Sequence, residues 1–139
     1  MGHPLLRANA KNVLSSEIAG AAIQALIDSM IETMTEHRGA GLAAPQVHEG
    51  LRIFVAEVVT ADDEDGQDAQ KADEREATEP VVMVIINPEI SPVGGHIVED
   101  WEGCLSIPDL RGLVPRHRDI KVRAFDREGQ RIEIEASGH

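Results

Sequence analysis

The chain is poor in aromatic residues and in cysteine. Among its 139 residues there are one tryptophan, two phenylalanines and no tyrosine. So few aromatic rings argue against the nucleic-acid modules that stack bases on aromatic side chains. The one cysteine, Cys104, excludes an internal disulfide framework and fits a reducing compartment. Any core must therefore be built from aliphatic side chains and methionine.

Basic charge and long apolar runs are also scarce. Thirteen lysines and arginines stand against 25 acids, which gives a net charge of −12. This balance argues against a basic nucleic-acid surface and against binding to an anionic membrane. The longest apolar run, residues 81–86, is too short to cross a bilayer, and residues 1–14 contain no signal-peptide core. We therefore predict a cytoplasmic protein without a direct nucleic-acid or membrane partner.

The sequence does contain one amphipathic pattern followed by several strand patterns. Aliphatic residues at helical spacing predict a helix over 16–37, capped by Ser15 or Ser16 and ended by Gly39. Alternating or continuous apolar residues predict strands at 52–59, 81–86 (stopped by Asn87-Pro88), 96–98 (after a Gly94-Gly95 hairpin turn), 119–125 and 131–136. The predicted fold class is α+β, a single domain over 1–139 with one N-terminal helix and about six short strands.

One segment, 61–79, is almost entirely polar. It contains nine acids against two bases, so it carries −7 of the net charge of −12. Because it has almost no apolar content, it predicts a mobile acidic loop inserted into the domain. A solvated insertion is the simpler interpretation, and a role in charge steering or partner binding is the alternative.

Cys104 is the most informative single residue, and its surroundings leave three interpretations open. They are a small core residue, a nucleophile and a metal ligand. The histidines do not decide between them, because no two have the i, i+4 spacing of helical zinc ligands. Each is interpreted by itself as a surface or capping residue. The six are His3, His37, His48, His96, His117 and His139.

Residues 39–46, Gly-Ala-Gly-Leu-Ala-Ala-Pro-Gln, are the second unusual feature. Closely spaced glycines permit unusual backbone angles and the close approach of another chain. The segment follows a helix and lacks the third glycine of a dinucleotide-binding fingerprint, and no Gly-Lys-Ser/Thr follows for a phosphate loop. By itself it indicates a tight structural turn.

Taken together, two motifs resemble the signatures of the peptide deformylase family. Residues 39–46 resemble the first signature, and residues 102–106, Glu-Gly-Cys-Leu-Ser, match the second in full. Their order also agrees with the family. Further segments resemble it at residues 2–7, 86–88, 107–108 and 114–116. The resemblance covers almost the whole chain except the acidic segment, and it implies the α+β deformylase fold.

The family's third signature is a helical His-Glu-x-x-His that supplies two metal-binding histidines and a general-base glutamate. It does not occur in the 139 residues, and the family pattern places it shortly after His139. The chain is therefore interpreted as a C-terminally truncated domain that lacks the metal-binding helix, with a genuine short paralogue as the alternative. We expect little or no activity from this chain alone.

The resemblance implies metal-dependent hydrolytic removal of the formyl group from N-formylmethionyl peptides, on nascent chains leaving the ribosome. It implies Fe(II), with Zn, Ni or Co as substitutes, and Cys104 corresponds to the thiolate ligand. Gln46 and the backbone N–H of Leu105 correspond to the donors that stabilise an oxyanion. A non-catalytic peptide-binding module is the alternative, and a hydrolase with Cys104 as the nucleophile is a third interpretation.

Other site residues are implied by their positions in the motifs. Gly41, with Ala40 before it, corresponds to the position where a bound peptide pairs as an added strand. Glu102 and Gly103 correspond to structural residues near the site. Glu102 is expected either to pair with an arginine, for which Arg116 is a candidate, or to cap local backbone. A separate expectation places Arg111 against the peptide.

Overall fold

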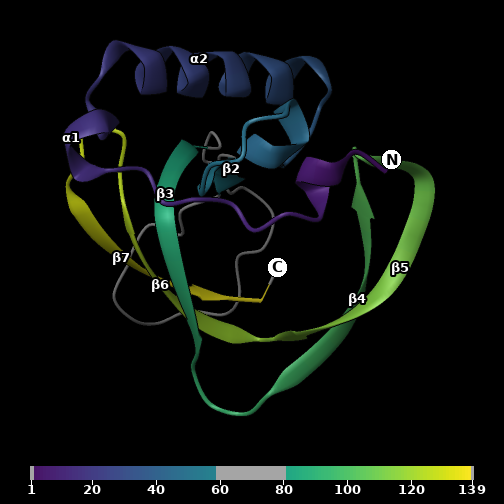
Figure 1. The fold of residues 1–139 in the computed structure, drawn as a ribbon. Helices are drawn as coiled ribbons and strands as arrows, with labels where there is room; N and C mark the ends of the chain where they lie inside the picture. The colour runs from purple at the N-terminus through teal and green to yellow at the C-terminus, as the bar shows by residue number, and fades with distance from the viewer. Residues whose placement is uncertain (1, 59–80, 139) are drawn as a thin grey trace, which may run out of the picture.

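The computed structural model describes residues 2–58 and 81–138. It contains a five-stranded sheet with a long helix lying across one face, and a separate two-stranded hairpin whose tip curves back to the N-terminal segment (Figure 1). This arrangement confirms the predicted α+β class. The predicted acidic loop, residues 61–79, lies outside the described residues.

Three helical elements come first in the described chain, a fourth lies between the first two strands, and strands alone make up the rest. The helical elements are η1 (Pro4–Leu6), α1 (Ser15–Ile18), α2 (Ala21–Glu36) and η2 (Ala44–Val47). The strands are β1 (Gly41–Ala43), β2 (Ile53–Val58), β3 (Val81–Pro92), β4 (Ile97–Cys104), β5 (Ile107–His117), β6 (Asp119–Phe125) and β7 (Arg131–Ser137). The larger sheet has the order β1-β2-β3-β6-β7 with every neighbouring pair antiparallel, and β4 pairs with β5.

The single helix predicted over 16–37 is wrong, because the chain breaks between α1 and α2. The Gly20 N–H bonds the Glu17 carbonyl oxygen at 2.9 Å and ends the first short helix. A Cβ added to Gly20 would lie 2.9 Å from that same oxygen, so the break requires glycine. The predicted cap is also wrong, since neither helix has a side-chain hydrogen bond at its N-cap and the serines lie inside α1.

The end of α2 differs from the prediction in one residue. Arg38, with φ of 52°, takes the left-handed position that was expected for Gly39. Its N–H bonds the Thr35 carbonyl, and the Gly39 N–H bonds the Met34 carbonyl at 3.0 Å. These two bonds satisfy carbonyls that the helix end would otherwise leave free.

The predicted strands 119–125 and 131–136 are confirmed as β6 and β7, and β2 confirms the described part of 52–59. The predicted stop at Asn87-Pro88 is wrong, because β3 continues to Pro92 after a shift of register. Asn87 takes a φ of 53° there. Its side-chain amide bonds both the N–H and the carbonyl of Val13 at 2.8 Å, which fixes the N-terminal segment to the bulge.

The predicted hairpin at Gly94-Gly95 is also wrong. In the described residues β3 and β4 are not paired, and the two glycines instead lead the chain from the larger sheet to the hairpin β4–β5. Most residues of this hairpin are exposed and none is buried. A strand pair without a buried face has no alternating pattern, so the sequence did not reveal its full length.

The main core lies between α2 and one face of the larger sheet. Ile27, Met30 and Met34 from the predicted apolar stripe are fully buried there, against Val55 and Ile86. A smaller cluster on the sheet contains Ile85, Val122 and Ala124. The core thus uses aliphatic side chains and methionine, as the composition predicts.

Candidate functional site

Gln46 belongs to a short 3₁₀ turn that directly follows the edge strand β1. Pro45 lies in the first turn of η2, where a residue without an N–H is tolerated. The Gln46 side chain turns back, and its Oε1 accepts a hydrogen bond from the Ala43 N–H at 2.9 Å. This bond fixes the oxygen end of the amide and leaves the nitrogen end facing the hairpin.

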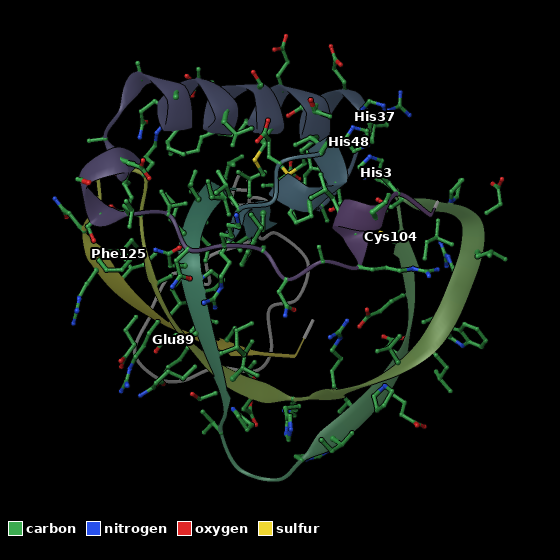
Figure 2. All side chains as sticks on the ribbon, viewed as in Figure 1. His3, His37, His48, Glu89, Cys104 and Phe125 are labelled. Atoms are coloured by element: carbon green, nitrogen blue, oxygen red, sulfur yellow. The ribbon has the colours of Figure 1, made fainter. Side chains whose placement is uncertain are left out.

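Cys104 ends β4, where the hairpin turns into β5. The register shifts between Gly103 and Cys104, and Cys104 lies opposite Ile107. The thiol is exposed, so the interpretation of Cys104 as a small core residue is wrong (Figure 2). An exposed sulfur at the tip of a hairpin is accessible to a ligand or substrate.

The structure brings the two sequence motifs together. Gln46 Nε2 lies 3.6 Å from Cys104 Sγ and donates to Ser106 Oγ at 3.1 Å, although 58 and 60 residues separate these partners along the chain. The Leu105 side chain also lies close to Gly39, since a Cβ added to Gly39 would lie 3.0 Å from Leu105 Cδ1. A glycine at this position therefore lets the hairpin tip pack against the end of α2.

Glu102 and Arg116 form an ion pair, so of the two expectations for Glu102 the structure shows the pairing with the candidate arginine. The Arg116 Nε and the second guanidinium nitrogen donate to the two carboxylate oxygens at 2.6 and 2.7 Å. The side-chain hydrogen bond with Glu102 raises the pKa of Arg116 above its ordinary value. This two-pronged contact joins β4 to β5 two residues before Cys104.

The other expected residues lie around this centre. Gly41 is in the edge strand β1, exposed, and pairs with Ala56 of β2. The Ala40 carbonyl accepts from the Glu57 N–H at 2.9 Å. Arg111 lies opposite Gly103 on the hairpin and is exposed. In the described residues β1 is paired on one side, so its other edge is available for strand addition.

The described residues do not form a complete metal site. Across 2–58 and 81–138, no three His, Cys, Asp or Glu side chains are grouped so as to hold a metal ion. The five described histidines are exposed, as predicted, and two of them, His3 and His48, stack with ring centroids 4.1 Å apart (Figure 2). Cys104 is therefore a single candidate ligand, and no chemical step through a metal follows from these residues.

Ser106 is the contact that sequence reasoning missed. It lies inside the second motif, yet no residue pattern predicts that its hydroxyl accepts from Gln46. Only the folding of η2 against the hairpin tip creates that contact. The site therefore combines the exposed Cys104 thiol with the Gln46 side-chain amide, whose oxygen is bonded to Ala43 and whose nitrogen is bonded to Ser106.

Comparisons with known proteins agree with the motifs. The model of the polypeptide deformylase family matches residues 1–139. Peptide deformylase 2 of Bordetella bronchiseptica is 42% identical to this chain over 118 residues. The matched region covers 84% of this chain and 60% of the Bordetella protein. The peptide deformylase of Salinibacter ruber is 42% identical to this chain over 137 residues, which are 99% of this chain and 66% of the Salinibacter protein. The chain thus spans about 60% of the first curated relatives that it matches.

Solved structures show the same similarity. A class I type b peptide deformylase from Acinetobacter baumannii, bound to Met-Ala-Ser, superposes with a TM-score of 0.80 at 30% identity. The match covers 99% of this chain and 80% of that one. A probable peptide deformylase from Synechococcus phage S-SSM7 gives 0.77 at 29% identity.

Proposed function

The chain belongs to the polypeptide deformylase family, and on that premise we propose that its protein removes the formyl group from N-formylmethionyl peptides by hydrolysis. The observation that carries this proposal is the position of Gln46 Nε2, 3.6 Å from Cys104 Sγ. Water attack on a formyl carbon places negative charge on the carbonyl oxygen. A fixed amide donor at that position stabilises the charge.

Two groups of this chain are proposed to hold the oxyanion. One is the Gln46 amide nitrogen, and the other is the backbone N–H of Leu105, the residue after Cys104. Removing one such donor typically raises the barrier by about 2.7–4 kcal/mol and so lowers kcat roughly 100- to 1000-fold. Support for Gln46 comes from its two hydrogen bonds, because a donor that is already oriented needs no reorganisation during the reaction.

The family is metal-dependent, and we propose Cys104 as one ligand of the metal in this protein. Fe(II) is the proposed native ion, with Zn, Ni or Co as substitutes. A bound divalent ion of this kind supplies a water molecule of lowered pKa. One thiolate does not hold such an ion specifically, so we propose that residues 1–139 alone have little or no activity.

The peptide is proposed to add as a strand to the free edge of β1. Gly41 and Ala40 lie there, and a small exposed residue allows the peptide backbone to come close. Arg111, exposed opposite Gly103 on the hairpin, is the proposed contact for the rest of the peptide. Glu102 and Gly103 are proposed to keep the hairpin tip in shape rather than to touch substrate.

The proposed partners are nascent chains at the ribosome, reached without direct nucleic-acid binding, and the proposed location is the cytoplasm. The acidic composition supports the absence of a nucleic-acid surface. In the described ranges, no helix has both the length and the apolar character needed to cross a membrane. We propose no membrane partner.

A non-catalytic peptide-binding module is the second candidate. The observation that favours it is the single metal donor at the site in the described residues. In that case the β1 edge would bind extended peptides without any hydrolysis. The two candidates share the binding surface and differ in turnover.

Formate release from formyl-Met-Ala-Ser by the full gene product, with Fe(II) or Ni(II) added, tests the hydrolytic function. We expect release that Cys104→Ala abolishes and that Gln46→Ala lowers roughly 100-fold. Residues 1–139 are assayed in parallel, where robust Cys104-dependent release would contradict their proposed inactivity. No release by the full product would overturn the hydrolytic proposal.

Peptide binding is tested separately by titrating Met-Ala-Ser into residues 1–139 and recording amide NMR shifts. We expect the shifts to gather at Gly41 and its neighbours in β1. Gly41→Val should prevent binding because a Cβ there would lie 3.3 Å from the Val55 carbonyl oxygen of β2 and would displace the edge strand, whereas Gly95→Ala, where an added Cβ meets nothing within 4 Å, should not. Binding without turnover in the full product would favour the module.

A further inference from the structure

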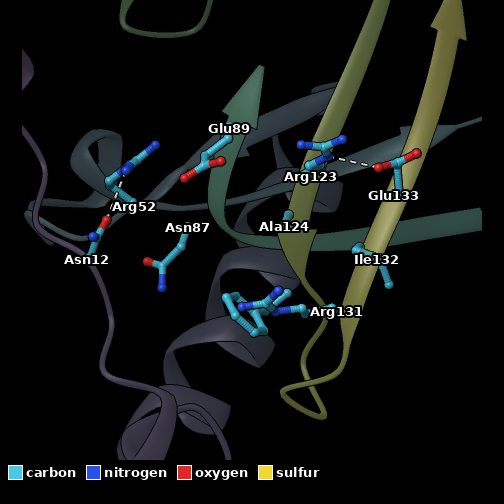
Figure 3. Close-up of a pocket in the computed structure, with 10 residues that line it drawn as sticks. Asn12, Arg52, Asn87, Glu89, Arg123, Ala124, Arg131, Ile132 and Glu133 are labelled. Carbon is cyan, nitrogen blue, oxygen red and sulfur yellow. Dashed lines mark hydrogen bonds and ion pairs between the residues drawn. The ribbon is translucent and has the colours of Figure 1, made fainter. Parts of the chain in front are cut away.

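A cavity lies on a part of the molecule away from Gln46 and Cys104. It has a volume of about 570 Å³ and is lined from the N-terminal segment, the start of β2, the bulge of β3 and the pair β6–β7 (Figure 3). Neither Gln46 nor Cys104 lines it. Its size is typical of sites for small ligands.

The charged residues of this cavity are three arginines and two glutamates. They are Arg52, Arg123, Arg131, Glu89 and Glu133. Three positive charges against two negative ones give a local excess of +1, in a chain whose net charge is −12. Such an excess is unusual in so acidic a chain and indicates a surface suited to an anion.

Two of the three guanidinium groups are held by neutral partners. Arg52 donates to Asn12 Oδ1 at 2.9 Å and to the carbonyl oxygen of Pro88. Arg131 lies over the ring of Phe125, with its guanidinium carbon 5.8 Å from the ring centroid. Within 2–58 and 81–138 neither arginine forms an ion pair. Both guanidinium groups are held in place, and neither is neutralised by an ion pair with a described residue.

The two carboxylates of the cavity act on Arg123, which also lines it. Glu133 accepts from Arg123 at 2.8 Å and from Lys121 at 3.2 Å. The charge of Glu89 also acts on Arg123, and it contributes to raising the pKa of that guanidinium after the larger effect of Glu133. Arg123 and Glu133 therefore form a pair within the cavity, and Lys121, which does not line it, also pairs with Glu135 at 3.0 Å. The excess of +1 comes from Arg52 and Arg131 against Glu89.

We propose that this cavity binds one oxyanion group, a phosphate or a carboxylate, between Arg52 and Arg131. A planar guanidinium presents parallel N–H donors that match the oxygens of either group. The ring of Phe125 offers an apolar surface next to the anion. The proposal does not depend on deformylase activity, since it uses other residues on another part of the fold.

Titration of residues 1–139 with inorganic phosphate, and separately with acetate at matched ionic strength, tests this site. NMR signals of the arginine Nε–H groups report the binding. We expect saturable shifts at Arg52 and Arg131, and at least a tenfold weaker affinity in Arg131→Gln and in Arg52→Gln. Arg118→Gln removes the same charge from an exposed residue outside the cavity, and its affinity should stay within about twofold of the parent.

The outcomes separate the possible causes. Saturation by phosphate alone identifies a phosphate group as the ligand, and saturation by acetate identifies a carboxylate. If the shifts never saturate, or if Arg118→Gln loses as much affinity as Arg52→Gln and Arg131→Gln, the effect is general charge screening and the proposal is overturned. Because Arg52 also joins the N-terminal segment to the bulge, Arg131→Lys serves as a second variant. Lysine keeps the positive charge but lacks the paired N–H donors of a guanidinium, so this variant should bind the anion more weakly than the parent.

Discussion

At the scale of single residues, the orientation of the Gln46 amide depends on partners from two distant segments. A backbone N–H only donates, so the bond from Ala43 identifies the end of the amide that carries oxygen. At the other end the nitrogen has two hydrogens, of which Ser106 accepts one at 3.1 Å. The other is directed at Cys104 Sγ, 3.6 Å from the nitrogen, and the developing oxyanion is proposed to accept it in place of the sulfur. Ser106 is thus a positioning residue for the proposed donor.

Replacing Ser106 by alanine should therefore release the Gln46 side chain. One hydrogen bond of about 1 kcal/mol would be lost, and the amide should rotate more freely. The measurement is the pair of Gln46 Nε2 hydrogen signals in an ¹⁵N NMR spectrum of residues 1–139, which should move toward those of a free glutamine. Ser106→Thr keeps a hydroxyl and should retain the parent signals. Unchanged signals in Ser106→Ala would contradict the positioning role.

At the scale of the elements, the break at Gly20 changes the expected effect of a Gly→Ala substitution on stability. Inside a helix, Gly→Ala stabilises by about 1 kcal/mol through propensity. In the structure the added Cβ would lie 2.9 Å from the Glu17 carbonyl oxygen, a backbone atom that cannot move without shifting α1. Gly20→Ala should instead lower the free energy of unfolding by about 1–3 kcal/mol.

Urea unfolding of Gly20→Ala beside Gly95→Ala measures this effect. A Cβ at Gly95 meets nothing within 4 Å, so that variant should stay within about 0.5 kcal/mol of the parent. A Gly20→Ala variant more stable than the parent would support one unbroken helix over 16–37 and contradict the break.

The pair β6–β7 should contribute to stability in a pH-dependent way. Hydrogen bonds from Arg123, and next from Lys121, hold the pKa of Glu133 below its ordinary value of 4.5. A carboxyl whose pKa is lowered in the folded state stabilises it above the unfolded pKa, and the contribution is lost as pH falls through the folded pKa. Glu133→Gln should therefore unfold more easily than the parent at pH 7, and the difference should shrink below about pH 4.5.

Urea midpoints from pH 7 down into the acid range, for Glu133→Gln and for Glu128→Gln, check this prediction. Glu128 lies in the β6–β7 turn and forms no ion pair with the described residues. Its variant should show no matching difference across that range. If both variants behave alike, net charge rather than the contacts of Glu133 sets the pH dependence.

The elements that the sequence predicted well are those with one buried face. Residues 119–125 and 131–136 alternate because Val122, Ile132 and Ile134 pack on one side, so β6 and β7 could be located from the pattern. The apolar stripe of α2 was visible for the same reason. The break at Gly20 and the bulge at Asn87 depend on single carbonyl and side-chain contacts, which periodicity does not contain.

At the scale of the whole molecule, the candidate site is formed between two parts that differ in burial. The motif with Gln46 follows the edge of the larger sheet, whose neighbours form the core. The motif with Cys104 lies at the tip of a hairpin without a buried side chain. The sequence could name both motifs and the Glu102–Arg116 pair, but not the contact through Ser106. It also could not predict the arginine cavity, because Arg52 and Arg131 are 79 positions apart in the numbering.

This difference in burial predicts that the hairpin opens independently of the core. Its exposed apolar residues include Trp101 and Leu113, a cross-strand pair with 63% and 51% of their surfaces accessible. Such a pair stabilises a strand ladder by only about 0.2–1 kcal/mol. Amides of β4 and β5 should therefore exchange with solvent much faster than those of β2, β3 and β6, which need global unfolding.

Hydrogen exchange of residues 1–139, followed residue by residue by NMR, measures the two rates. Trp101→Ala should speed exchange in the hairpin further and leave the core amides unchanged, because it removes only the cross-strand contact. Leu110→Ala is the matched control, since this exposed leucine has no partner in the β4–β5 register. Equal protection of hairpin and core would mean that contacts beyond the described residues hold the Cys104 tip in place. The proposed metal ligand would then be rigid before any ion binds.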